Sequence, residues 1–146
     1  MTRNEVLLNY FDKFPNIKRY VKDQYVSLEW IDKDIKFGIA DNPTGAGGVI
    51  FRDVLGNEIK AHSFMFSAMF TYSDDTMKML ENSEFFEDLE YWIKTNNRKG
   101  ILPEFDDGRQ ALTVRVMQTP YLFMVDPNNA QAQYTMILQL EYKERR

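Results

Sequence analysis

Residues 49–72 read VIFRDVLGNEIKAHSFMFSAMFTY, and this stretch decides the fold. Two alternating runs, Val49–Leu55 and Glu58–Tyr72, flank the pair Gly56-Asn57, which is typical of a two-residue hairpin turn. Closing the turn on this pair places Asp53 opposite Lys60, so that unlike charges face each other across the ladder. The sequence therefore predicts a long β-hairpin in this register.

The two faces of this hairpin differ in composition. One face is expected to be core because aromatic and small apolar residues occupy every second position: Phe64, Phe66, Ala68, Phe70 and Tyr72, joined by Val49 and Phe51. The opposite face carries Ile50, Val54, Ile59, Ala61, Met65 and Met69. A sheet face open to water is normally more polar than this, so we expect another surface to cover it.

The segments before the hairpin predict a helix, two short strands and a loop. Apolar residues recur at helical spacing over Val6–Phe14, Thr2 and Glu5 form a capping box, and Pro15 ends the helix. The runs Tyr25–Trp30 and Ile35–Ala40 are typical of strands. Turn-forming residues then fill Asp41–Gly48.

The segments after the hairpin predict a second helix and more strands. Residues 74–80 could make a helical turn, and a firmer helix begins at Ser83 and ends at Gly100. Strands are expected at 112–117, 121–125 and 133–142, with a turn at 126–129. The whole is one α+β domain, residues 1–146: an N-terminal helix, a mostly antiparallel sheet built as a meander with a long hairpin, a second helix packed on the sheet, and a C-terminal hairpin.

The composition excludes several kinds of chemistry. The chain has no Cys and a single His, which excludes disulfides, thiolate metal sites and Cys nucleophiles. The net charge of −4 lacks the basic excess of a free nucleic-acid-binding protein. No apolar run reaches the ~18 residues of a membrane span, and the N-terminus has no signal-peptide core, so we expect a soluble product without a membrane partner.

Individual candidates for chemistry have structural explanations. His62 falls inside the hairpin, opposite Phe51, and is predicted to be a packed or half-exposed strand histidine. The loop Gly45–Gly48 leads into a strand, whereas a phosphate-binding loop leads into a helix. Paired acids such as Asp74-Asp75 and Asp106-Asp107 lack ligand-loop spacing. We therefore predict no catalytic residue, no cofactor and no metal site; a small enzyme that uses carboxylates is the less favoured alternative.

Along most of the chain, the order and spacing of several pieces resemble one protein family. The pieces are the N-terminal amphipathic helix, the strand Phe64–Tyr72, Asn82–Phe86 with Leu89 and Trp92-Ile93, Gly100–Pro103, and the final strand with Ala132–Tyr134 and Leu140–Tyr142. Together they are similar to the minor capsid and tail-terminator (head–tail completion) proteins of long-tailed bacteriophages.

The resemblance implies a non-enzymatic virion protein, made in the cytoplasm of the host bacterium. Such a protein forms a homo-oligomeric ring, commonly a hexamer, which contacts tail-tube and head-completion proteins while DNA passes nearby without sequence-specific binding. The family has no catalytic residues to transfer. A tail-terminator role and a head-completion or stopper role both remain open.

The residues and the resemblance lead to one hypothesis about an interface. A neighbouring copy would bury the apolar second face and the loop before the hairpin, through Asp41, Asn42, Pro43, Thr44, Gly45, Ile50, Val54, Ile59 and Met65. In one alternative, strand Tyr25–Trp30 or the first helix covers that face within a single chain. In another, the protein is a monomeric binding module or assembly factor.

Overall fold

The computed structural model describes residues 2–14, 27–28, 37–43, 45, 47–71, 76–126 and 131–145. The elements in chain order are α1 (Arg3–Phe11), β1 (Ser27–Leu28), β2 (Phe37–Asp41), β3 (Gly48–Arg52), β4 (Glu58–Thr71), α3 (Thr76–Lys99), β5 (Gln110–Asp126) and β6 (Gln131–Glu144). The sheet order is β1-β2-β4-β6-β5, and β3 pairs with β4. All of these pairings are antiparallel except β1 with β2. The predicted α+β class is confirmed.

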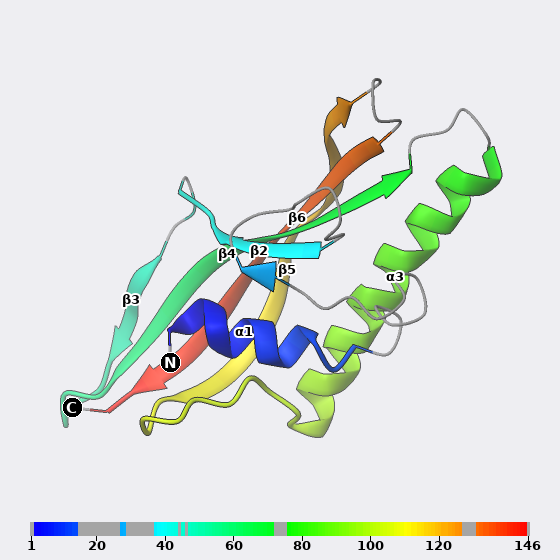
Figure 1. The fold of residues 1–146 in the computed structure, drawn as a ribbon. Helices are drawn as coiled ribbons and strands as arrows, with labels where there is room; N and C mark the ends of the chain where they lie inside the picture. The colour runs from blue at the N-terminus through cyan, green and yellow to red at the C-terminus, as the bar shows by residue number, and fades with distance from the viewer. Residues whose placement is uncertain are drawn as a thin grey trace.

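Both described helices pack on the same face of the sheet (Figure 1). One cluster of buried side chains joins α1 and α3 to β2, β4, β5 and β6. Phe11 of α1 lies at its centre, with ring centroids 6.0 Å from Phe64, 5.1 Å from Phe66 and 6.1 Å from Trp92. The alternation predicted for β4 is therefore correct for Phe64, Phe66 and Ala68, which are fully buried.

The first helix begins where its local signals place it. Thr2 accepts a hydrogen bond from the Glu5 N–H (3.2 Å), and the Glu5 carboxylate accepts one from the Thr2 N–H (3.3 Å). This is the predicted capping box. The helix ends at Phe11, earlier than Pro15, but Phe14 still packs into the core beside Phe85.

The second helix is longer than predicted. It runs without a break from Thr76 to Lys99, so the helix start expected at Ser83 is wrong. A Ser inside a helix costs only about half a kcal/mol relative to Ala, which a helix of 24 residues tolerates. The end is as predicted, since Gly100 has φ +74°, a conformation that favours glycine.

The β3–β4 hairpin forms, but in a different register. Phe51 lies opposite Ile59 and Arg52 opposite Glu58, and the register shifts between Val49 and Phe51. The predicted pairings of Asp53 with Lys60 and of Phe51 with His62 are therefore wrong. The connection is a loop over residues 53–57, not a two-residue turn.

The Asp53 side chain explains the longer loop. Its Oδ1 accepts hydrogen bonds from the N–H groups of Leu55 and Asn57, both at 2.9 Å, and its Oδ2 accepts one from Asn57 Nδ2 at 3.1 Å. Partial removal from water raises the pKa of the Asp53 carboxyl, but these hydrogen bonds outweigh it and hold the pKa below its ordinary value. Asp53 therefore organises the loop instead of pairing across the ladder.

The C-terminal strands confirm the predicted hairpin, with one difference. The runs predicted at 112–117 and 121–125 belong to a single strand, β5, which pairs with β6 through four register shifts. Pro120 is accommodated because β5 is an edge strand of the described sheet. Of the predicted strand Tyr25–Trp30, residues 27–28 form β1; the rest of that strand, residues 74–75 and most of the turn at 126–129 lie outside the described residues.

Asn97 ties α3 to the edge of β5. Its Nδ2 donates to the Val114 carbonyl oxygen (2.7 Å), and its Oδ1 accepts from the Val114 N–H (3.2 Å). Replacing Asn97 with Ala is expected to lower the free energy of unfolding by about 1–3 kcal/mol, because two backbone groups lose their partners. Asn97→Asp should cost more, since a carboxylate cannot donate to the carbonyl.

Urea denaturation measures both variants, with Arg98→Ala on the exposed side of the same turn as control. We expect the control to stay within about 0.5 kcal/mol of wild type. If Asn97→Ala and Arg98→Ala lowered the free energy of unfolding equally, the hydrogen bonds from Asn97 to β5 would contribute nothing to stability.

Candidate assembly surfaces

The hairpin presents apolar side chains to water. Every residue of β3 is exposed. We call β3 together with the loop that follows it, residues 48–57, the β3 arm. Its exposed large apolar side chains are Val49 (48%), Ile50 (54%), Phe51 (58%), Val54 (102%) and Leu55 (73%). An exposed apolar edge strand is a site where another chain can bind.

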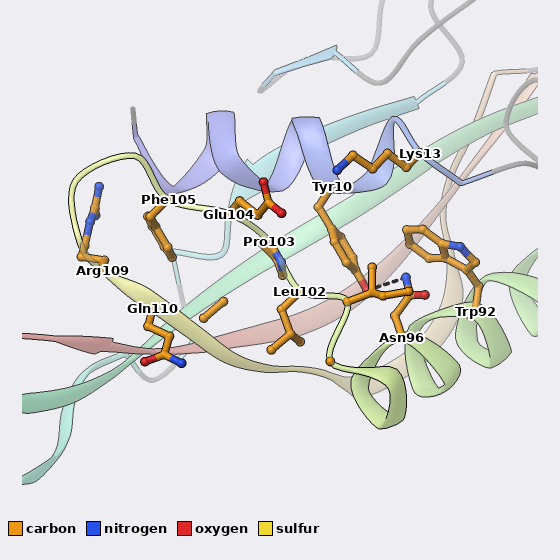
Figure 2. A pocket seen from close by; sticks show the side chains of 13 residues that line it. Tyr10, Lys13, Trp92, Asn96, Leu102, Pro103, Glu104, Phe105, Arg109 and Gln110 are labelled. Carbon is orange, nitrogen blue, oxygen red and sulfur yellow. Dashed lines mark hydrogen bonds between the residues drawn. The ribbon is translucent and has the colours of Figure 1, made fainter.

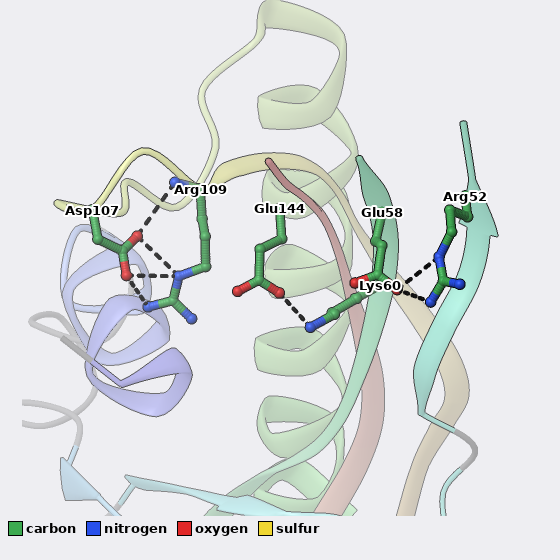
Figure 3. Close-up of polar contacts among 6 residues, drawn as sticks. All are labelled: Arg52, Glu58, Lys60, Asp107, Arg109 and Glu144. Carbon is green, nitrogen blue, oxygen red and sulfur yellow. Dashed lines mark hydrogen bonds and ion pairs between the residues drawn. The ribbon is translucent and has the colours of Figure 1, made fainter. Parts of the chain in front are cut away.

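Polar contacts hold the arm in shape (Figure 3). Arg52 Nη2 donates to Glu58 Oε2 across the hairpin at 2.7 Å, and Lys60 forms an ion pair with Glu144 of β6. Such exposed pairs contribute little stability, and β3 is also held by its antiparallel pairing with β4. The arm is therefore ordered by its loop and by polar bonds, while its apolar side chains remain outside the core.

A second set of exposed apolar side chains lies in the second half of β5, toward the other end of the sheet. It comprises Met117 (56% exposed), Leu122 (50%), Phe123 (58%) and Met124 (48%), and we call it the distal β5 patch. Met124 pairs with Gln133 of β6, whereas the base of the arm at Glu58 pairs with Glu144. At about 3.3 Å per residue, these two positions of β6 are roughly 35 Å apart. In Figure 1, β3 and the end of β5 lie at opposite ends of the sheet.

The structure divides the predicted interface residues into separate groups. Ile50 and Val54 belong to the arm, at the register shift and in the loop. Ile59 and Met65 are half-buried on the face of β4 away from α1 and α3. The predicted single apolar face that includes Val54 is therefore wrong, because the changed register removes Val54 from it.

The predicted loop folds back on β4. Asn42 donates its N–H to the Ser63 carbonyl oxygen (3.1 Å) and its Nδ2 to Ser63 Oγ (3.0 Å). Gly45 lies so close to Ser63 that a Cβ at this position would overlap the Ser63 side chain. Pro43 is exposed, and Thr44 lies outside the described residues. The described part of the loop is therefore packed against its own sheet.

Asp41 lies beside His62 and the start of α1. Asn4 Nδ2 donates to Asp41 Oδ1 (2.9 Å), and His62 Nε2 lies 3.0 Å from Asn4 Oδ1 and 3.4 Å from Asp41 Oδ1. Burial, helped by the charge of Arg3 and opposed by Asp41, lowers the pKa of His62 to about 4. The imidazole is thus neutral at pH 7 and donates from Nε2 to Asn4, as a packed strand histidine does.

A recess of about 730 Å³ lies between the two helices and the loop after α3 (Figure 2). Asn96 Nδ2 donates to Tyr10 Oη at 3.3 Å, and burial raises the pKa of Tyr10 to about 12. Arg109 is bound to Asp107 at 2.7 Å and lies 4.4 Å above the Phe105 ring. Glu104 is the one acidic residue among the described residues that line this recess. Tyr10 and Asn96 bind each other, and the described lining contains no pair of acids.

A second recess, which we call the α3–β5 groove, separates α3 from the edge strand β5 and has a volume of about 610 Å³. It is lined by Glu87, Glu90, Tyr91, Ile93, Lys94 and Asn97 of α3 and by Val114, Arg115, Val116 and Thr119 of β5. Two acids and two cations share it, whereas Glu104 is the one acid among the described residues that line the first recess.

Sequence reasoning missed the distal β5 patch and the groove. The run of apolar residues at 121–125 is a signal for the patch, because an edge strand with consecutive apolar residues cannot bury all of them. Nothing local indicates the groove, which exists only because α3 and β5 lie side by side.

Among the described residues, no group of His, Cys, Asp and Glu is placed to hold a metal ion. Neither described helix combines the length and apolarity needed to cross a membrane. In comparisons with known proteins, no protein-family model and no curated protein matches this chain.

Proposed function

We propose that this protein is a non-enzymatic virion protein of a long-tailed bacteriophage, a minor capsid or tail-terminator subunit that completes the head–tail junction as a ring of copies. The β3 arm carries the proposal: five of its large apolar side chains, three in β3 and two in the loop, are about half exposed or more, and β3 contributes nothing to the core. A strand of this kind gains its stabilisation from a partner.

The placement of the two apolar surfaces favours a ring. The β3 arm and the distal β5 patch differ in sequence and lie at opposite ends of one sheet. Contact between unlike surfaces of identical chains is heterologous, and it generates a closed ring when the rotation between neighbours closes. The resemblance to head–tail completion proteins supports a hexamer that contacts tail-tube and head-completion proteins in the virion, with DNA passing through.

Replacing both Val54 and Leu55 with Asp should abolish self-association. These are the two most exposed apolar side chains of the arm, so the fold should tolerate the change. By light scattering, the wild-type protein should have a mass that is a multiple of 17.3 kDa, and the variant should have a mass of 17.3 kDa. The matched control is Ile101→Asp, an exposed apolar residue outside both surfaces, which should keep the wild-type mass.

Two results would count against the proposal. An arm variant that keeps the wild-type mass would show that the arm makes no contact between copies. A wild-type protein of 17.3 kDa at every concentration would instead favour a monomeric binding module or assembly factor whose arm binds a different protein.

A further inference from the structure

The α3–β5 groove combines an apolar lining with an exposed rim. Ile93 and Val114 are buried, Val116 is half-buried, and Tyr91 on the rim is 67% exposed. The groove reaches Thr119, which lies between Met117 and Leu122 of the distal β5 patch along the same strand. The groove thus lies beside the middle of β5, and the distal β5 patch continues from it along the same strand.

The groove carries two cations, Lys94 and Arg115, and two acids, Glu87 and Glu90, and the acids can meet a cation of the arm. Glu87 and Glu90 lie three residues apart, on one side of α3. Burial, and then the charge of Glu87, raise the pKa of Glu90, although Lys94 offsets part of this effect. A further cation would stabilise the ionised form of Glu90, and the arm carries Arg52, whose side chain is bound to Glu58 but still 66% exposed.

We propose that the α3–β5 groove receives the β3 arm of a second copy, with Val54 and Leu55 against Tyr91 and Val116, and with Arg52 beside Glu87 and Glu90. This inference rests on the proposed ring and names the two surfaces that meet in it.

The contact is made by side chains, not by adding a strand to the sheet. The edge of β5 has register shifts between Val116 and Tyr121 and contains Pro120, which interrupt the hydrogen-bonding pattern that a new strand would need. Asn97 already occupies the backbone groups of Val114. The groove beside this edge thus accepts protruding side chains such as those of the arm's loop.

The area available explains why closure into a ring matters. With roughly 150–200 Å² for a fully exposed large apolar side chain, the arm offers on the order of 500 Å² for burial. The arm and the surface that receives it would together bury about 1,000 Å², which is at the lower limit for a specific interface. One contact is therefore weak, and a ring, in which every subunit makes two, is stabilised cooperatively.

Two complementary variants test the pairing. The arm-blocked variant is Val54→Asp/Leu55→Asp, and the groove-blocked variant is Tyr91→Lys/Thr119→Lys, which changes exposed residues and adds charges that repel Arg52. Each alone should sediment at 17.3 kDa, and an equimolar mixture should form a species of twice that mass, about 35 kDa, whose share rises with concentration because a single contact holds it. Glu104→Lys, outside the groove, should assemble as wild type does.

The possible failures are distinguishable. A groove-blocked variant that assembles as wild type does would overturn the groove inference and leave the ring intact. Two monomeric variants that form no complex on mixing would also overturn it. An arm-blocked variant that assembles normally would contradict the proposed function itself. If circular dichroism shows that Tyr91→Lys/Thr119→Lys is unfolded, Glu87→Arg at an exposed position replaces it, with the same expected masses.

Discussion

Replacing Phe11 with Ala is expected to lower the free energy of unfolding by about 3–5 kcal/mol. Phe11 is fully buried and its ring contacts those of Tyr10, Phe64, Phe66 and Trp92, so one side chain joins α1 to both β4 and α3. Its removal leaves a cavity among rings that pack from three different elements. Urea denaturation measures the loss.

Phe51→Ala is the matched control, because the same side chain is removed from the arm. Phe51 is 58% exposed, so its replacement should change the free energy of unfolding by less than about 1 kcal/mol. Both substitutions should be measured in the Val54→Asp/Leu55→Asp variant, because association then adds nothing to the free energy of unfolding. If Phe51→Ala cost as much as Phe11→Ala, the arm would be part of the core, and the reason for giving it a partner would disappear.

The stability of the protein should fall between pH 6.5 and pH 4 because of His62. Burial lowers the pKa of this histidine from an ordinary 6.5 to about 4. Within that window the unfolded chain therefore binds a proton that the folded chain does not, so stability decreases as pH falls and levels off below about pH 4. A shift of this size corresponds to about 3 kcal/mol.

His62→Gln isolates this effect. The glutamine Nε2 can donate to Asn4 Oδ1 as the imidazole does, but it does not titrate. Between pH 7 and pH 4, wild type should lose about 3 kcal/mol more than the variant, since the carboxylates titrate in both proteins. If the free energies of unfolding of wild type and His62→Gln changed with pH in parallel, His62 would not be held neutral by the fold.

The parts of the fold that depend on local patterns could be predicted. The capping box of Thr2 and Glu5 begins α1, Gly100 ends α3, and the alternation around Phe64 and Phe66 identifies the core face of β4. The hairpin register could not be predicted in the same way. Gly56-Asn57 favours a two-residue turn, but the Asp53 carboxylate binds two backbone N–H groups and stabilises a longer loop.

The candidate surfaces were accessible to sequence reasoning only in part. Ile50 and Val54 were expected to lie at an interface and are exposed, although they belong to an arm and not to a shared sheet face. Their role between copies stays a prediction. Asn42 and Gly45 pack on Ser63, and their predicted contact with a neighbouring copy stays a prediction. Those positions follow from tertiary contacts, which alternation along the chain does not encode.

Sedimentation velocity of the wild-type protein over a hundredfold range of concentration tests the central claim most directly. Heterologous contacts that close should give two species, a 17.3 kDa chain at low concentration and one discrete larger particle at high concentration. A 17.3 kDa species throughout, or particles that grow without limit, would contradict a ring built through the β3 arm.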